Sequence, residues 1–382
     1  MSTTVSVETA ISVTSLRKSF ANEEVLRGID LTIEDGEFCV VVGPSGSGKS
    51  TLLKCIAGLL DFDHGTVSLN GEDVSGVPVR ERGLGFVFQD FEERLFPHMS
   101  VRSNVAFGLE QGDEDLSEAE IDERIDEMLE LLAIPETADD VPSSLSGGQQ
   151  QRVELARQLV RRCDVMLLDD PLADLDYKLQ KRMELEMRSI HSDLGSTFVY
   201  VTHNQDQALK LADKLVVMNQ GMLEQVGTPD EVYANPETAF VGRFVGDSNP
   251  LLGSVVSDDG ETVTVDTRTG EVRADPRYDV PDEGTEVVVL VRPESMKLGA
   301  EAEGCDNTLP ATLKGRTYTG EYTEFTVGVE GATEDFQVVK SGNVPMEAID
   351  EETTVGWNSD DGVAHEQLSV SDTVTVGDLL EV

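Results

Sequence analysis

Positive charge is scarce in this chain of 382 residues. It contains 29 Lys and Arg against 74 Asp and Glu, which gives a formal net charge of -45. Residues 245–382 hold 8 basic and 30 acidic residues, a net of -22, so residues 1–244 carry the remaining -23. An excess spread in this way fits neither an acidic tail nor a local docking patch. Because no basic stripe exists to neutralise phosphates, no nucleic-acid partner is expected.

The acidic excess has two interpretations. At molar salt the Debye length falls to about 3 Å, so a protein there tolerates strong repulsion between its own charges. We therefore hypothesise a salt-accumulating halophile as the source, with an ordinary acidic protein as the alternative.

Cysteine and long apolar runs are scarce as well. The four cysteines, which are Cys39, Cys55, Cys163 and Cys305, include no C-x-x-C pair. This excludes a disulfide framework or a cysteine metal site and predicts small structural residues. No apolar run approaches the roughly 20 residues that span a bilayer, and the polar start of the chain lacks the features of a signal peptide. We expect a soluble cytoplasmic chain whose membrane role requires partners.

Apolar residues make up 39% of the chain, enough for an ordinary core, and the length suggests two domains. From Ile11 to about Asn235, short apolar strands alternate with amphipathic helices, which predicts a largely parallel sheet covered by helices. The clearest strands are 38–42, 165–169, 198–202 and 214–218. Their continuous apolar character predicts burial on both faces. A capping box at Ser117 and Glu120 predicts a helix over 118–133.

Short β-rich runs replace the helical pattern after Val245. The clearest runs are 262–266, 286–291 and 322–329. Since Gly, Asp and Pro turns separate them, they predict a small β-barrel or sandwich. Before them, Thr228 and Pro229 open a short helix that reaches about residue 235. The expected fold class is α/β. Residues 11–240 would form an α/β domain that includes a helical subdomain, and residues 245–382 would form a β-rich domain.

A glycine-rich segment follows the strand at 38–42. It matches G-x-x-x-x-G-K-[ST] and lies between a strand and a helix, the context that this phosphate-binding motif requires. Its backbone N–H groups would surround phosphate oxygens, with Lys49 reaching the β- and γ-phosphates and Ser50 ligating Mg²⁺. ATP and Mg²⁺ are therefore the expected cofactors. The nucleotide-binding residues of this segment are Gly43, Pro44, Ser45, Gly46, Ser47, Gly48, Lys49, Ser50 and Thr51.

A second motif is the apolar strand that ends at Asp169. A carboxylate there can hold Mg²⁺ directly or through a bound water, although a lone strand-terminal Asp commonly caps a helix. In a chain that also has the phosphate loop, we expect Asp169 to hold the metal. Together the two motifs predict a P-loop nucleotidase and nothing narrower.

Residues 145–152, which read Leu-Ser-Gly-Gly-Gln-Gln-Gln-Arg, narrow the class. A serine and two glycines that open a helix present N–H groups and a hydroxyl to an anion. The segment resembles the signature motif of ABC ATPases, which caps the γ-phosphate bound by the opposite subunit. The resemblance implies a head-to-tail dimer with a second ATPase subunit, identical or different. The residues that would cap the nucleotide are Ser146, Gly147, Gly148 and Gln149.

Further landmarks of ABC ATPases follow along the chain. The resemblance implies that Phe20 stacks adenine, that Gln89 ligates Mg²⁺ and senses the membrane subunit, and that His203 contacts the γ-phosphate. Asp176, in the pair Leu175-Asp176, resembles the aspartate of the family's D-loop. Asp170 stands where the family normally has Glu as general base for the attacking water. Because Asp is one methylene shorter, we hypothesise that it still activates water but turns over more slowly than Glu would.

The β-rich domain resembles the regulatory, TOBE-like domain of ATPases from binding-protein-dependent importers. Residues 291–294 resemble a recurrent segment of that domain, and residues 240–247 resemble its beginning. The nearest group is the spermidine/putrescine importers, with iron(III), phosphonate, sugar and sulfate importers as alternatives. The resemblance implies transmembrane permease subunits as partners, an extracellular solute-binding protein acting indirectly, and a peripheral place at the cytoplasmic side of the cell membrane.

Two other classes stay open. A soluble ABC ATPase acting on nucleic acid usually carries coiled-coil insertions or two fused cassettes, and this sequence shows neither. A non-hydrolysing regulatory subunit is suggested by Asp170. The chain departs from the family at three further places. Residues 90–95 lengthen the segment after Gln89, and this stretch is either a partner surface or a tolerated loop insertion. Asp174 and Asn204 replace residues that are commoner beside the family's D-loop and switch motifs.

Overall fold

A computed structural model of the protein describes residues 8–21, 23–88, 95–110, 116–173, 177–277, 281–346, 349–371 and 373–380. The chain divides into two compact units between Asp230 and Glu231. The domain ranges expected from the sequence, 11–240 and 245–382, stay predictions. Every helix in the described residues is too short or too polar to span a bilayer.

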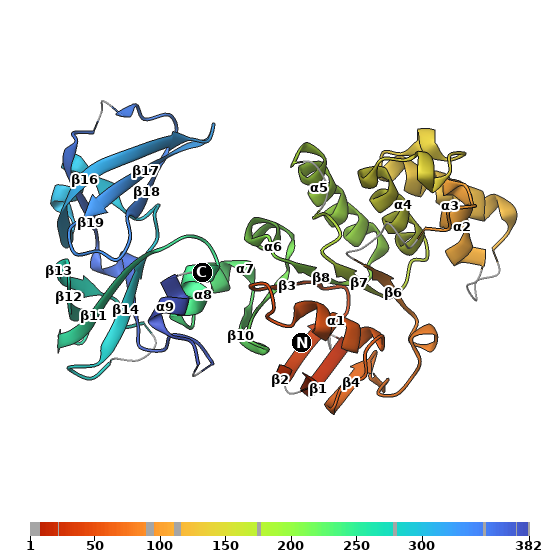
Figure 1. The fold of residues 1–382 in the computed structure, drawn as a ribbon, viewed down its shortest axis with the longest axis horizontal. Helices are drawn as coiled ribbons and strands as arrows, with labels where there is room; N and C mark the ends of the chain where they lie inside the picture. The colour runs from red at the N-terminus through yellow and green to blue at the C-terminus, as the bar shows by residue number, and fades with distance from the viewer. Residues whose placement is uncertain are drawn as a thin grey trace, which may run out of the picture. The chain divides into compact units, whose positions relative to one another are not determined.

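The first unit is built on a six-stranded sheet (Figure 1). Its strands are, in spatial order, β10 (Met222–Gly227), β9 (Lys214–Asn219), β3 (Phe38–Val42), β8 (Thr197–Thr202), β7 (Val165–Asp169) and β6 (Leu84–Val87). Of these, β10 runs antiparallel to its neighbour and the others run parallel. Every residue of β3, β7 and β8 is buried, as expected for strands covered on both faces. The four predicted strands are confirmed, with β8 and β9 each extending slightly further.

An antiparallel sheet, which the sequence pattern does not distinguish, lies beside the first. Its strands are β2 (Glu23–Glu34), β1 (Thr9–Phe20), β4 (His64–Leu69) and β5 (Glu72–Asp73), in this order. Helix α1 (Lys49–Ala57) packs between the two sheets, and its apolar side chains share one core with both (Figure 1). Cys39 and Cys55 are buried in this core as structural residues. Burial raises the pKa of Cys55 to about 11, which keeps the thiol uncharged.

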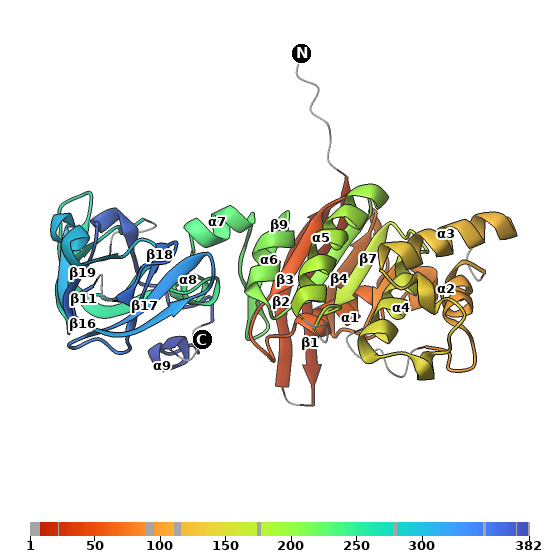
Figure 2. The same ribbon diagram turned by 90° about the horizontal axis from the view of Figure 1, so that it is seen from above.

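Helices complete the first unit on two sides. Helices α5 (Tyr177–Leu194) and α6 (Gln205–Leu211) cover the face of the parallel sheet opposite α1 (Figures 1 and 2). Helices α2 (Val101–Glu110), α3 (Glu118–Leu131) and α4 (Gly147–Leu159) pack on one another as the expected helical subdomain. Single 3₁₀ turns lie at Val79–Glu81, Pro135–Thr137 and Pro142–Ser144.

The capping box that predicts α3 is present. The Ser117 backbone N–H donates to Glu120 Oε2 at 2.9 Å, and the Ser117 hydroxyl accepts from the Glu120 N–H at 3.4 Å. The helix ends at Leu131, slightly before the predicted residue, because Ala133 adopts a φ of 53°. Arg152 of α4 then satisfies the Ala133 carbonyl oxygen at 2.9 Å. The prediction of the helix is confirmed, and its predicted end is corrected from residue 133 to Leu131.

The second unit contains two five-stranded antiparallel sheets. The first has the order β13 (Gly270–Ala274), β12 (Val263–Thr267), β11 (Asn249–Asp258), β14 (Glu286–Val291) and β20 (Gly362–His365). The second has the order β15 (Lys297–Leu298), β19 (Glu352–Trp357), β16 (Asn307–Tyr318), β17 (Tyr322–Val329) and β18 (Phe336–Ser341). Asp275, just after β13, bridges to Val363 of β20 and closes the first sheet on itself. The predicted small β-barrel or sandwich is confirmed, with the first sheet nearly closed in the manner of a barrel.

Short helices accompany these sheets. They are α7 (Pro229–Ala234), which begins as predicted at Pro229, α8 (Ala239–Phe244), α9 (Val376–Leu380), and the 3₁₀ segments Gly299–Gly304 and Ser359–Asp361. The sequence shows no helical pattern for α9 and the 3₁₀ segments after Val245, because they are too short to show a 3.6-residue period. The predicted strands at 286–291 and 322–329 are confirmed, and the strand predicted at 262–266 begins and ends one residue later.

Arg292 joins residues 291–294 to residues 240–247, the two segments that carry the resemblance of this domain. Its Nη1 donates to the carbonyl oxygens of Gly242 and Gly246 at 2.8 and 2.7 Å, at the end of α8. Its Nη2 donates to the Tyr233 carbonyl oxygen at 3.0 Å, and the guanidinium lies 4.3 Å from the centre of the Tyr233 ring. One half-buried cation therefore fixes two helix ends of the second unit, which is a structural role.

Candidate functional site

The phosphate loop connects β3 to α1, and steric constraints demand its glycines. A Cβ on Gly43 would lie 2.1 Å from the carbonyl oxygen of Met218, so no larger residue fits. Gly46 and Gly48 have φ values of 82° and 99°, which other residues rarely adopt. Gly48 is also the N-cap of α1 and provides no side-chain capping hydrogen bond. The N-cap residue therefore provides no side-chain acceptor for the first N–H groups of α1, as an anion site at a helix N-terminus requires.

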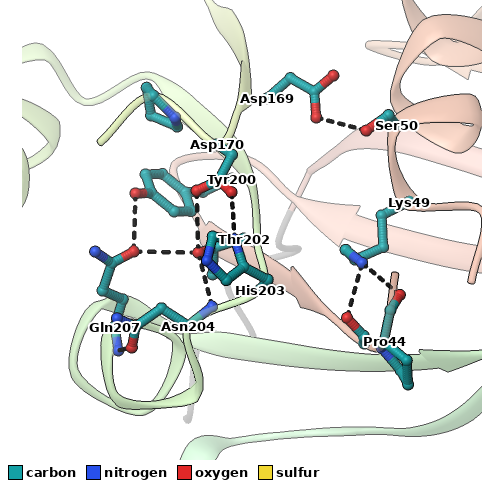
Figure 3. A network of polar contacts seen from close by, with 12 residues as sticks. Pro44, Lys49, Ser50, Asp169, Asp170, Tyr200, Thr202, His203, Asn204 and Gln207 are labelled. Carbon is teal, nitrogen blue, oxygen red and sulfur yellow. Dashed lines mark hydrogen bonds and ion pairs between the residues drawn. The ribbon is translucent and has the colours of Figure 1, made fainter. Parts of the chain in front are cut away.

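Lys49 reaches back across this loop. Its Nζ donates to the carbonyl oxygens of Gly43 at 2.7 Å and Pro44 at 2.8 Å (Figure 3). Burial lowers the pKa of Lys49, and the nearby carboxylates of Asp170 and Asp169 oppose that shift. The loop thus holds a partly desolvated ammonium group, a donor that suits phosphate oxygens.

Ser50 and Asp169 point toward one another at the end of β7 (Figure 3). The Ser50 hydroxyl donates to Asp169 Oδ1 at 2.8 Å. Burial raises the pKa of Asp169, while the hydrogen bond from Ser50 lowers it. A hydroxyl and a carboxylate are hard oxygen ligands, and Mg²⁺ is typically held by one or two such groups plus substrate phosphates. The described residues contain no cluster of three or more His, Cys, Asp or Glu that could hold a metal alone. The pair therefore fits a magnesium ion shared with a nucleotide.

Asp170 and His203 form a second pair. Asp170 Oδ2 lies 2.6 Å from His203 Nδ1, and the Asp170 N–H donates to the carbonyl oxygen of Val201 in β8 at 2.9 Å. Asp170 is buried and has a φ of 47°, a left-handed conformation that Asp and Asn tolerate better than most residues. The His203 side chain is 65% exposed. The pair thus joins a fixed carboxylate to an imidazole that faces solvent.

Four further polar residues surround Asp170, and the sequence reasoning did not assign them a role. They are Tyr200, Thr202, Asn204 and Gln207, on β8 and at the start of α6 (Figure 3). Tyr200 and Thr202 are fully buried on a strand that is otherwise almost entirely apolar. A polar side chain at such a position usually has a hydrogen-bond partner. A Tyr and a Thr within this apolar strand were therefore the signal in the sequence that could have indicated the polar network.

The signature residues lie at the N-terminus of α4. The Ser146 hydroxyl accepts from the Gln149 N–H at 3.4 Å, and Gln149 Oε1 accepts from the Ser146 N–H at 3.0 Å. Ser146 and Gly147 are exposed. These residues form a capping box with each other, at a helix end that is open to solvent.

Gln151 connects α4 to the turn beside Asp170. Its Nε2 donates to the carbonyl oxygen of Pro171 at 2.8 Å, and the side chain is buried. The sequence reasoning missed this contact, because a glutamine inside a helix gives no local signal of the loop it meets.

Phe20 ends β1. It is 46% exposed, and Lys18 Nζ lies 5.3 Å from the centre of its ring. An exposed aromatic face at a strand end is compatible with the predicted stacking on adenine.

The structure brings the residues on β3, β7 and β8 together, because these strands are neighbours in the order β3-β8-β7. Residues 43–51, Asp169, Asp170 and His203 lie at their carboxyl ends, where parallel sheets bind ligands. Within the described part of the chain, no hydrogen bond or ion pair connects Phe20 or residues 146–149 to this group. The remaining predicted residues, Gln89, Asp174 and Asp176, and residues 90–94 lie outside the described residues.

Sequence families match both units. Residues 26–173 match the ABC transporter family, and residues 289–364 match the TOBE domain family. The spermidine/putrescine import ATP-binding protein PotA of Marinobacter nauticus is 41% identical over 86% of this chain and 86% of its own length. The protein with the same name from Thermobifida fusca is 42% identical over 83% of each chain.

Solved structures also match part of this chain. The structure of cbiO1 from Clostridium perfringens, part of the ABC transporter complex cbiONQ, has a TM-score of 0.54 and 31% identity, covering 60% of this chain and 92% of its own. The dimeric structure of the ATP-binding cassette MJ0796 in a post-hydrolysis state, bound to ADP and Pi, has a TM-score of 0.53 and 29% identity. That match covers 57% of this chain and 98% of the cassette.

Proposed function

This chain belongs to the ABC transporter family of ATP-binding proteins, and on that premise we propose that it is the ATP-hydrolysing subunit of an importer whose solute is a polyamine. The observation that carries the proposal is the convergence of Lys49, the Ser50–Asp169 pair and the Asp170–His203 pair at three neighbouring strand ends. The solute class rests on the relatives, whose names specify spermidine and putrescine import. Importers of iron(III), phosphonate, sugar or sulfate are the alternatives.

Each residue of the pairs has a chemical task in hydrolysis. Lys49 and the loop N–H groups bind the β- and γ-phosphate oxygens of ATP. Asp170 accepts a proton from the water that attacks the γ-phosphorus, the bond to the bridging oxygen breaks, and ADP leaves. His203 Nδ1 is engaged by Asp170, so Nε2 is the atom that would contact the γ-phosphate.

Mg²⁺ would be held by Ser50 and Asp169, with Gln89 as a further ligand. When bound, it neutralises negative charge on the phosphates. The hydroxyl–carboxylate pair at 2.8 Å supports this assignment.

The active unit in this proposal is a dimer. Ser146, Gly147, Gly148 and Gln149 of one subunit would complete the site of the other, which agrees with their position at a helix end where Ser146 and Gly147 are exposed. The dimer would lie at the cytoplasmic side of the membrane as a peripheral part of a complex with permease subunits, and an extracellular binding protein would deliver the solute.

Phosphate release from the purified protein with MgATP, in about 2–3 M KCl, tests the function. The unaltered protein is expected to hydrolyse ATP, Lys49→Ala to lose hydrolysis, and Asp170→Glu to turn over faster. A stable dimer that binds ATP and releases no phosphate would instead identify a non-hydrolysing regulatory subunit.

Reconstitution with the permease and the binding protein tests the solute. Spermidine or putrescine is expected to stimulate phosphate release, because the loaded binding protein signals through the permease. Stimulation by iron(III), a phosphonate, a sugar or sulfate, and not by a polyamine, would reassign the importer.

The net charge of -45 supports a further part of the proposal, a cytoplasm with molar salt. The midpoint of thermal unfolding is expected to rise between about 0.1 M and about 3 M KCl, because salt screens the repulsion among carboxylates. An unchanged or lower midpoint at high salt would leave an ordinary acidic protein.

A further inference from the structure

The carboxylate of Asp170 has two different partners, one on each oxygen. Oδ2 faces His203 Nδ1 at 2.6 Å, and Oδ1 lies 3.3 Å from the Thr202 hydroxyl (Figure 3). His203 is largely exposed, whereas Thr202 is fully buried at the end of β8. A β-branched side chain in a strand has few rotamers, so Thr202 is the rigid partner. Thr202 is therefore the rigid group that can hold the Oδ1 side of the carboxylate in place.

The Thr202 hydroxyl has one proton and two acceptors to choose between. Its Oγ1 lies 3.3 Å from Asp170 Oδ1 and 3.1 Å from Gln207 Oε1, while the Asn204 N–H donates to it at 3.0 Å. A hydroxyl donates to only one acceptor at a time. Whether Asp170 receives the proton thus depends on how Gln207 is satisfied.

Tyr200 supplies Gln207 with another donor. The Tyr200 hydroxyl donates to Gln207 Oε1 at 3.2 Å, and both side chains are buried. Burial holds the pKa of Tyr200 well above its usual value, so the phenol keeps its proton. The backbone N–H of Gln207 donates to Asn204 Oδ1 at 3.0 Å, and this bond fixes the start of α6. With Gln207 supplied by Tyr200, the Thr202 proton is available to Asp170.

We infer that Thr202, set by Gln207 and Tyr200, is a positioning residue that holds the Asp170 carboxylate for hydrolysis. The inference rests on the proposed function, since it concerns the same site. It also accounts for the short side chain of Asp170. The Asp170 N–H is bonded to Val201 and its carboxylate to Thr202, so backbone and side chain are both anchored to β8. The precision that this anchoring supplies offsets part of the reach that the missing methylene removes.

Three substitutions in the full-length protein test the inference. Thr202→Val removes the hydroxyl at nearly constant volume and is expected to lower kcat by about tenfold with the KM for ATP unchanged, because a positioned base acts only in the chemical step. Thr202→Ser keeps the hydroxyl and should retain most of kcat. Tyr200→Phe deprives Gln207 of its donor, so Thr202 turns toward Gln207 and kcat falls by about threefold.

Thr197→Val is the matched control. Thr197 lies on the same strand and is equally buried, but its hydroxyl accepts from the Gly36 N–H at 3.0 Å at the far end of β8. This variant should leave kcat unchanged even where it lowers the unfolding midpoint. Equal losses of kcat in Thr202→Val and Thr197→Val would overturn the inference, since general destabilisation of β8 would then explain both.

An Asp170→Glu background separates positioning from other effects. A carboxylate one methylene further from the backbone no longer depends on Thr202, so Thr202→Val should lower kcat much less there. An undiminished loss in that background overturns the inference while leaving the proposed function intact. An unaltered protein that releases no phosphate, with Lys49→Ala indistinguishable from it, overturns the proposed function itself and the inference with it.

Discussion

Two helices of the first unit begin with glycine-rich segments, and their first turns are arranged differently. Helix α1 follows Gly48, which provides no side-chain cap, so its first N–H groups have no side-chain acceptor. Helix α4 follows Ser146, and the reciprocal bonds between Ser146 and Gln149 form a complete capping box. The start of α1 therefore has no side-chain acceptor that competes with an anion, whereas an anion at the Ser146 hydroxyl or the Gln149 N–H of α4 must replace a hydrogen bond of the capping box.

The cost of that exchange is moderate. A capping side chain stabilises a helix by about 1 kcal/mol, while a hydrogen bond to a charged group contributes about 1.5–3 kcal/mol. A phosphate from a neighbouring subunit can therefore replace the capping box of Ser146 and Gln149. In the proposed dimer, α1 would hold the nucleotide and α4 would respond to it.

The largest expected effect concerns the phosphate loop at the start of α1. Lys49→Ala should lower phosphate release by about 10²–10³-fold, because the ammonium that would stabilise phosphate charge is lost. Lys314→Ala, which replaces an exposed lysine on β16 of the second unit, is the control and should retain most activity. Phosphate release measured in parallel decides, and a Lys49→Ala protein as active as the control would contradict the assignment of the loop.

A smaller effect is expected on the α4 side. Ser146→Asp preserves a good N-cap, so the unfolding midpoint should stay within a few degrees of the unaltered value. Its carboxylate repels a phosphate, however, so hydrolysis should fall by about 10²-fold. Ser146→Ala is the matched variant, because it removes the N-cap without adding a charge. It is expected to lower the free energy of unfolding by about 1 kcal/mol. Full activity in Ser146→Asp would show that the signature serine meets no phosphate.

The smallest effect separates the two segments by stability alone. Gly48 has a φ of 99°, and a Cβ there would lie 2.9 Å from the Val25 carbonyl oxygen. Gly48→Ala should therefore lower the free energy of unfolding by about 1–3 kcal/mol. Gly147 begins α4, where alanine is the better helix former by about 1 kcal/mol, so Gly147→Ala should be neutral or stabilising. Chemical denaturation measures both, and equal destabilisation would remove the distinction.

Sequence alone could predict the features that local chemistry dictates. Gly43 and Gly48 are required by close backbone approaches, and the strands ending at Val42 and Asp169 are buried on both faces, so motif and pattern located them. The antiparallel sheet could not be separated, because the pairing of β1 with β4 joins residues far apart in the chain.

The polar surroundings of the site were also beyond local signals. The bond from Tyr200 to Gln207 depends on where α6 packs, and the bond from Gln151 to Pro171 depends on how α4 meets the turn after β7. Such contacts are set by tertiary packing, which no spacing within one segment records. The roles assigned to Phe20, Gln89, Asp170 and His203 stay predictions.

The left-handed backbone at Asp170 also affects which mutations this position accepts. The codons of Asp and Glu differ only in their third base, so a single nucleotide change converts one residue into the other. At a φ of 47°, short side chains such as Asp and Asn are tolerated, while most others meet a strain of about 1–2 kcal/mol. A change to Glu therefore meets an energetic barrier from the backbone that is separate from any effect on the chemistry of hydrolysis.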